Sequence, residues 1–169
     1  MKTSGMKHKT LGILLLVLFS QLTLSNEYSS HTSINWLPEE FKQKLTSEKC
    51  SIPKNIVWSH DIKIPADAII IGQFAQQGQY DIAIICHSNN TDRLFIHWGG
   101  DKSCPNGVRS NGESISSAHT ENINNRIHQY GVKKTPTITH NGIEDLIIGK
   151  SSFINYCHDG KWLNLDAAD

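Results

Sequence analysis

The sequence lacks the short motifs that mark most enzymes and metal proteins. Its 169 residues contain no Gly-x-Ser-x-Gly segment, which excludes the nucleophile elbow of many serine hydrolases, and no His-Glu-x-x-His segment, which excludes the common zinc-protease helix. None of its cysteines forms a Cys-x-x-Cys pair, so neither a zinc knuckle nor a thioredoxin-type redox site is expected. Apart from a weak calcium loop considered below, we therefore expect no cofactor.

Positive charge is scarce outside the N-terminus. The chain has 16 basic and 16 acidic residues, and three of the lysines, Lys2, Lys7 and Lys9, lie at its very start. Without the first 25 residues, 13 basic residues remain against 16 acidic ones, a formal charge of −3. Proteins that bind nucleic acids or anionic membranes need a basic surface, so we expect neither as a partner.

Long apolar runs are limited to one segment, Leu11–Leu24. It follows the basic start, and the small residues Thr23 and Ser25 occupy positions −3 and −1 of a cut after Ser25. These are the three parts of a secretory signal peptide. The run is shorter than the ~20 residues that a membrane helix needs. We therefore predict a signal peptide over 1–25, no membrane span in the mature chain, and a periplasmic or secreted location.

The mature part is long enough for one domain with its own core. Its first residues are polar and Ser-rich, so we expect a flexible leader over 26–36 and a single globular domain over 37–169. Four cysteines in an exported chain predict two disulfides, with three possible connectivities. We favour Cys50–Cys86 with Cys104–Cys157, each closing a long loop worth roughly 4 kcal/mol in the chain-entropy model. Free, reactive cysteines are the lesser alternative.

The pattern of apolar residues predicts an α+β fold. Leu37, Phe41 and Leu45 recur at helical spacing, which predicts an amphipathic helix from about Pro38 to about Glu48. A second short helix is expected over Ser117–Tyr130. The strands that we expect are Ala68–Phe74, Tyr80–Cys86, Arg93–Trp98, Leu146–Ile148, Ser152–Cys157 and Trp162–Leu165. Turns of a few residues between them favour one antiparallel sheet of five or six short strands, stabilised by disulfides, with Gly99–Ser117 as an exposed loop.

One segment in the middle of the chain resembles the FG-GAP repeat of integrin-like propellers. It reads Gly72-Gln73-Phe74-Ala75 and then Gly78-Gln79-Tyr80-Asp81-Ile82-Ala83-Ile84. The repeat usually carries several Asp or Asn in its turn to hold calcium, whereas this turn is Gln-Gln-Gly-Gln. A single copy is too little for a propeller, because several blades are needed.

A wider resemblance is to a set of uncharacterised exported bacterial proteins. The shared positions in the first half are Cys50, Ile52, Pro53, Gly72, Phe74, Asp81, Ala83 and Cys86. Those in the tail are His140, Gly142, Ile143, Asp145, Gly149, Lys150, Ser152, Tyr156, Gly160, Trp162, Leu163, Ala168 and Asp169. The resemblance implies a common fold and carries no known activity. It also supports the Cys50–Cys86 pairing, because both cysteines belong to the shared pattern.

The best candidate binding site is the segment Thr139–Asp145, with His140, Asn141, Glu144 and Asp145 as candidate binding residues. Related tails resemble an abbreviated calcium loop here, and calcium prefers oxygen ligands around a Gly turn. Thr139 and Asn141 replace two of those acids, so any Ca²⁺ binding should be weak. The alternative is an ordinary Gly-containing turn.

Other candidate chemistry is weaker. The histidines show no pairs at metal-binding spacing. Glu144 and Asp145 are sequence neighbours, so on a strand they would point to opposite faces and could not act as an acid–base pair. Trp98 and Trp162 could form a binding platform, but in a small β domain we expect them to be core anchors.

These observations favour an exported, non-enzymatic binding or interaction module. We expect its partner to be a protein or a component of the cell envelope. One alternative is an inhibitor or immunity protein against a cell-wall enzyme, with Gly99–Ser117 as its reactive loop, since an anchored exposed loop is pre-organised for a cleft. Another is a hydrolase with its site near His140–Asp145.

Overall fold

The computed structural model describes residues 28–53, 68–110, 114–130, 136–147 and 150–167. The predicted signal peptide lies outside these residues. The elements in chain order are β1 (Tyr28–Ser30), the 3₁₀ turn η1 (His31–Ser33), α1 (Glu39–Ser47), β2 (Ser51–Pro53), β3 (Ile69–Gly72), β4 (Asp81–Ser88), β5 (Thr91–His97), β6 (Val108–Arg109), β7 (Ser114–Ala118), α2 (Thr120–Tyr130), β8 (Gly142–Ile147), β9 (Ser151–His158) and β10 (Lys161–Ala167). No helix within the described ranges has the length and apolar character to cross a membrane.

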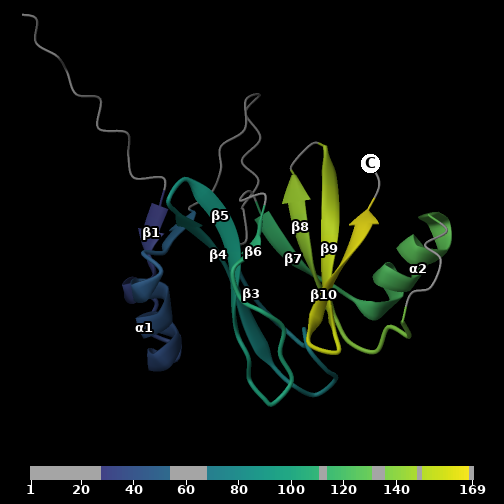
Figure 1. Cartoon of the computed structure of the whole chain (residues 1–169), viewed down its shortest axis with the longest axis horizontal. Helices are drawn as coiled ribbons and strands as arrows, with labels where there is room; N and C mark the ends of the chain where they lie inside the picture. Colours follow the sequence, from purple (N-terminus) through teal and green to yellow (C-terminus); the bar gives the residue numbers. More distant parts are fainter. Residues whose placement is uncertain (1–27, 54–67, 111–113, 131–135, 148–149, 168–169) are drawn as a thin grey trace, which may run out of the picture.

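The strands form two antiparallel sheets, not the single sheet that the sequence predicts (Figure 1). The first has six strands in the order β1-β2-β4-β5-β6, with β3 also paired to β4, and the second has four in the order β10-β9-β8-β7. The broad α+β class agrees with the expectation. The strand count differs because β1, β2, β6 and β7 are short or rich in serine and lack the apolar alternation that marks a strand in a sequence.

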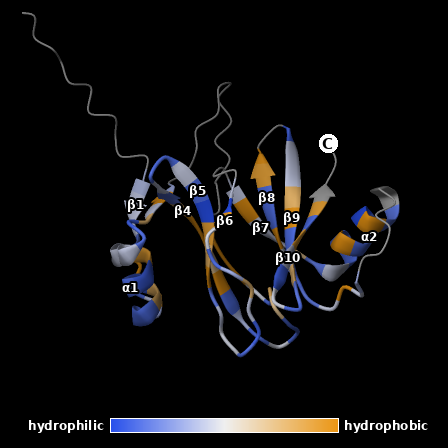
Figure 2. Ribbon diagram, viewed as in Figure 1, coloured by the Kyte–Doolittle hydropathy of each residue, from blue (hydrophilic) through white to orange (hydrophobic). Residues whose placement is uncertain are grey.

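The elements stack in four layers. α1 covers the outer face of the first sheet, where the Phe41 ring lies 5.5 Å from the His97 ring. The other face packs against the second sheet, so that Ile115 and Ile143 belong to the same core as α1. α2 covers the far face of the second sheet and places Ile123 in a second core. Figure 2 shows the apolar residues gathered on the strands and on parts of both helices.

Each sheet contains a meander of four sequential antiparallel strands, β3–β6 in the first and β7–β10 in the second. The predicted exposed loop Gly99–Ser117 is therefore wrong over part of its length, because β6 and β7 fall within it. Ile115 on β7 is fully buried between the sheets and supplies the apolar contact that holds this serine-rich strand in place.

The N-terminal part differs from the flexible leader expected over 26–36. β1 pairs with β2, and η1 precedes α1, so the helical content there is not one helix alone. The buried His31 holds this segment in place, because its ring bonds the Cys50 carbonyl at 3.0 Å and the Thr46 hydroxyl at 2.9 Å. A polar segment with few apolar residues is thus fixed by a histidine that bridges to the end of α1.

Two disulfides link the chain, and both favoured pairings are confirmed. Cys50–Cys86 ties the segment after α1 to β4, and Cys104–Cys157 ties the loop after β5 to β9. The second bond joins the two sheets. No cysteine among the described residues is free.

Candidate binding site at the loop end

One end of the molecule gathers the loops of both sheets. We define this loop end as residues 73–80, 98–105, 138–141 and 158–160, which follow or precede β3, β4, β5, β8, β9 and β10. It occupies the lower edge of Figure 1. Three features fix its shape: a buried carboxylate, a buried histidine and a set of links between the sheets.

The buried carboxylate is Asp81, the first residue of β4, whose side chain is fully enclosed. Its Oδ2 accepts the backbone N–H groups of Phe74 (2.8 Å) and Ala75 (3.2 Å). Its Oδ1 accepts the N–H of Gly99 (3.0 Å) and the Gln79 side-chain amide (2.7 Å). A buried charge is stable only when its acceptor sites are satisfied, and here one side chain holds two loops together through four donors.

Close backbone approach accompanies these bonds. A Cβ atom at Gly99 would collide with the Tyr80 carbonyl oxygen, so this position needs a glycine. Gln79 extends the network, since its side chain also bonds the backbone of Lys102 through both its amide nitrogen (2.8 Å) and its oxygen (3.2 Å). Loops 73–80 and 98–105 therefore form one rigid unit.

The buried histidine is His140, which lies just before β8. Its Nε2 bonds the Cys157 carbonyl at 2.8 Å and its Nδ1 lies 3.1 Å from the Tyr156 hydroxyl, whose oxygen accepts the Thr139 N–H at 3.1 Å. The two rings are stacked with centroids 4.3 Å apart. A consistent pattern places the proton on Nε2 and lets the Tyr156 hydroxyl donate to Nδ1. Burial lowers the pKa of His140, and the nearby His158 lowers it further, while the Cys157 carbonyl and Asp81 act in the opposite direction.

Links between the two sheets complete the loop end. The Asn141 N–H donates to the Gln73 carbonyl at 2.9 Å, and the Trp162 indole N–H donates to the Pro105 carbonyl at 2.7 Å. The Trp98 and Trp162 rings pack together with centroids 5.9 Å apart. Both tryptophans are partly buried against the main core, in the anchoring role that the sequence suggests. Together with Cys104–Cys157, these contacts hold the loops of the two sheets in one fixed arrangement.

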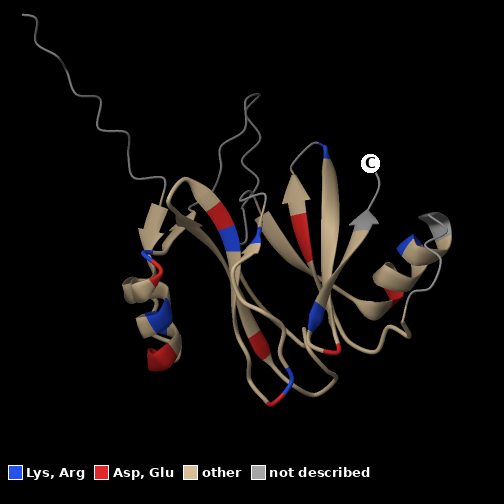
Figure 3. Cartoon of the chain, in the orientation of Figure 1, with Lys and Arg blue, Asp and Glu red and all other residues tan. Residues whose placement is uncertain are grey.

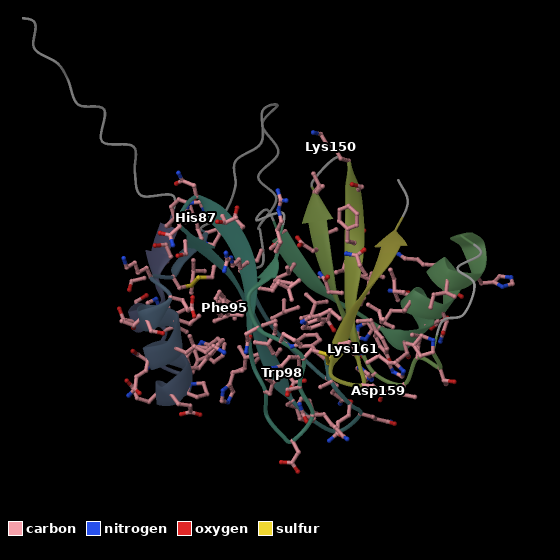
Figure 4. All side chains as sticks on the ribbon, viewed as in Figure 1. His87, Phe95, Trp98, Lys150, Asp159 and Lys161 are labelled. Carbon is pink, nitrogen blue, oxygen red and sulfur yellow. A yellow bond between two sulfur atoms is a disulfide. The ribbon has the colours of Figure 1, made fainter. Side chains whose placement is uncertain are left out.

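The surface of this end is polar and hollowed. A pocket of about 220 Å³ opens between the loop after β5 and the β9–β10 turn. Its lining consists of Asp101, Lys102, Ser103, Cys157, Asp159 and Gly160. Figure 3 shows an acidic and a basic segment side by side at the tip of the loop after β5, and Figure 4 places Asp159 beside it. Charges of both signs therefore surround a small concavity on a rigid support.

The four residues predicted from the sequence are not brought together. Gly142 to Asp145 belong to β8 rather than to the loop that the calcium interpretation assumes. Glu144 bonds Arg126 of α2, whereas Asp145 lies on the opposite face, buried among the inward-facing residues. The Asn141 side-chain amide donates a hydrogen bond to the Ser117 hydroxyl (2.9 Å). Across the described ranges, no group of three or more His, Cys, Asp or Glu is placed to hold a metal ion.

Sequence reasoning missed the residues that shape the loop end. Asp81 enters only through the two resemblances, and the sequence assigns no role to Gln79 or Tyr156. The available signal was an acid at the start of an otherwise apolar strand, because a strand that is buried on both faces has no place for an unpaired carboxylate.

Comparison with protein-family models, curated proteins and solved structures gives no match for this chain. The resemblance to the FG-GAP repeat and to exported bacterial proteins therefore stays a prediction. The geometry of the loop end is the feature that points to a function.

Proposed function

We propose that the protein is an exported binding module that recognises its partner through the loop end. The observation that supports this is the combination of a fixed framework with an exposed, charged pocket. The Asp81 hydrogen bonds and the Cys104–Cys157 disulfide hold the loops on their buried side, while Asp101, Lys102 and Asp159 remain exposed at the surface. A pre-organised surface loses little conformational entropy on binding, which favours affinity.

The partner that fits this surface is a protein or envelope component with charges of both signs. Lys102 can pair with a carboxylate and Asp101 or Asp159 with an amine, and the pocket of about 220 Å³ is small enough to take one side chain or one terminal group. Opposite charges at such positions give specificity more than raw affinity. Export is part of the proposal, because two disulfides persist in an oxidising compartment.

The test uses purified mature protein as bait against a periplasmic and cell-envelope extract, with photo-crosslinking from the loop end. We expect the wild type to capture a defined partner and the double variant Lys102→Ala with Asp159→Ala to lose it. Lys150→Ala is the matched control, because it removes an exposed lysine at the opposite end of the molecule (Figure 4). Equal capture by all three proteins, or crosslinks that map away from the loop end, would contradict the proposal.

An inhibitor of a cell-wall enzyme is a second candidate, which one observation favours. Residues 99–105 carry the exposed tip and are fixed at Cys104 by the disulfide and at Pro105 by Trp162. Loops held at their base in this way suit insertion into an enzyme cleft. If the captured partner is an enzyme, its activity should fall on adding the wild-type protein and not on adding the Lys102→Ala, Asp159→Ala variant.

A further inference from the structure

A second cluster of reactive side chains lies away from the loop end, on the first sheet. The strand register places Ser51 of β2 directly opposite His87 of β4, and His87 directly opposite Asp92 of β5. Partners in an antiparallel pair point to the same face, with Cβ atoms about 4.5–5.5 Å apart. A serine, a histidine and an aspartate therefore form one row across three neighbouring strands.

The histidine and the aspartate are already joined. His87 Nδ1 lies 2.8 Å from Asp92 Oδ1. Since an ionised carboxylate can only accept, Nδ1 carries the proton of the neutral ring and Nε2 keeps a free lone pair. Tyr28 stacks on the same ring with centroids 4.8 Å apart. The orientation of His87 is thus fixed from two sides, and its basic nitrogen is defined by the Asp92 contact.

The Ser51 hydroxyl and the Nε2 atom of His87 are the two remaining polar groups of the row. Among the described residues, neither the Ser51 hydroxyl nor the Nε2 atom of His87 takes part in a hydrogen bond. Both side chains of the His87–Asp92 pair are 28 % exposed, so small molecules can reach them. The Cys50–Cys86 disulfide joins the residues immediately before Ser51 and His87, which holds β2 against β4 at this point. The pairing of Ser51 with His87 therefore places the hydroxyl and the imidazole at neighbouring positions on one face of the sheet.

We propose that Ser51 and His87 form a nucleophile and general base for acyl transfer from a carboxylic ester, with Asp92 as the positioning residue. The Ser51 oxygen adds to the ester carbonyl carbon as its proton passes to His87 Nε2. The alkoxide leaves with that proton, and the acyl group remains on Ser51. Water then adds to the acyl-enzyme by the same route, giving the acid and regenerating the serine. This is the general logic of a nucleophile beside a base that a third group orients.

The probe for this site is a fluorophosphonate, which phosphonylates an activated serine hydroxyl and releases fluoride. We expect the mature protein to be labelled at Ser51, as located by peptide mass spectrometry. His87→Gln should slow the labelling about 100-fold, the usual contribution of a general base. Ser30→Ala is the matched control, because Ser30 pairs with Ser51 one strand further from the histidine and has its own bond to Thr32. It should leave the labelling unchanged.

The positioning role of Asp92 needs a readout that mere folding does not move. Asp92→Asn should slow labelling while the melting temperature stays near that of the wild type, and Asp92→Glu should restore part of the rate. If Ser51→Ala does not fold, the His87→Gln and Asp92 series still decides the matter, since Ser51 is present in each. No labelling at Ser51 beyond that of the other serines, or labelling that His87→Gln leaves unchanged, would show the row to be a structural surface pair.

Discussion

The two meanders carry the same short sequence pattern and use it differently. Each has a glycine three residues before a buried aspartate: Gly78 and Asp81 in the first meander, and Gly142 and Asp145 in the second. In the first, the glycine adopts a positive φ of 84° in a loop, and the strand begins only at Asp81. In the second, the strand begins at the glycine itself, so Asp145 lies inside it.

The two glycines differ in the atoms that lie next to them. A Cβ at Gly78 would meet open space, so this residue is required only for its backbone conformation. A Cβ at Gly142 would lie 2.6 Å from Ile154 Cγ2 and 3.3 Å from Ile123 Cδ1. The second glycine therefore leaves room for Ile154 on the neighbouring strand β9 and, less tightly, for Ile123 of α2. Identical residue types at identical spacing thus serve a turn in one sheet and close side-chain packing in the other.

The largest effect in this comparison should follow from Asp81→Asn. An amide in place of the carboxylate can accept through one atom only, so the N–H donors of Phe74 and Ala75 or of Gly99 lose their partner in a buried site. We expect a loss of about 3 kcal/mol in the free energy of unfolding, since hydrogen bonds to charged groups are the strong ones and unpaired buried donors are costly. Urea denaturation followed by tryptophan fluorescence measures it. A loss below that of an exposed control, Asp101→Asn, would contradict the role assigned to Asp81.

The two glycines offer a sharper test with a smaller expected effect. Gly142→Ala should lower the free energy of unfolding by about 1–3 kcal/mol, because the added methyl group overpacks against Ile154 of β9 and Ile123 of α2. Gly78→Ala should cost about 1 kcal/mol, the penalty for a positive φ in a non-glycine residue. Urea melts of both variants under the same conditions give the comparison. If Gly78→Ala were the more damaging change, the proposed difference between turn and close contact would be wrong.

Much of the fold follows from the sequence where apolar residues repeat with a clear period. The segments that became α1, β4, β5 and β9 show this, because each buries a recognisable stripe. β7 could not be found in the same way, since four of its five residues are small or polar and Ile115 is its one large apolar side chain, although the small Ala118 is buried as well. Its position depends on pairing with β8, a long-range contact that no local pattern records.

The candidate site was harder to predict than the fold. His140 was singled out for possible ligand binding, yet both its ring nitrogens face groups of the protein itself. Sequence shows that a histidine is present, but not whether it is enclosed. The loop end also depends on residues from both halves of the chain, such as Asn141 and Gln73, that meet only after the two sheets pack.

Acid should destabilise the loop end through His140. Its pKa is lowered in the folded state, chiefly by burial, whereas in the unfolded chain it has its ordinary value near 6.5. Below pH ~6.5 the unfolded chain therefore binds a proton that the folded protein resists, so stability falls with decreasing pH until the folded-state pKa is passed. Urea melts between pH 8 and pH 4.5 measure this slope.

The control for the pH effect is His140→Gln, which keeps a polar side chain and does not titrate. The variant should be less stable at pH 8, and the difference in unfolding free energy between the two proteins should shrink as the pH falls below 6.5. A constant difference across the range would mean that His140 does not couple protonation to folding.

The smallest effect should come from calcium at the start of β8. The resemblance to exported bacterial proteins predicts an acidic loop here, but Gly142 to Asp145 form a strand and the Asn141 amide is bonded to Ser117. Calcium needs several oxygen ligands around one point, and Thr139 and Asn141 supply no charge. We therefore expect millimolar Ca²⁺ to leave the melting temperature unchanged, although a ligand at 100 times its Kd would add about 2.7 kcal/mol of stability.

The double variant Thr139→Asp with Asn141→Asp completes the comparison. Because the backbone of this segment is already committed to β8 and to Gln73, the added acids should destabilise the protein without creating a calcium response. A calcium-dependent rise of several degrees in the melting temperature of the variant would show instead that the segment can leave the strand and close around a cation. It would then behave as a turn, like the segment around Gly78 in the first meander.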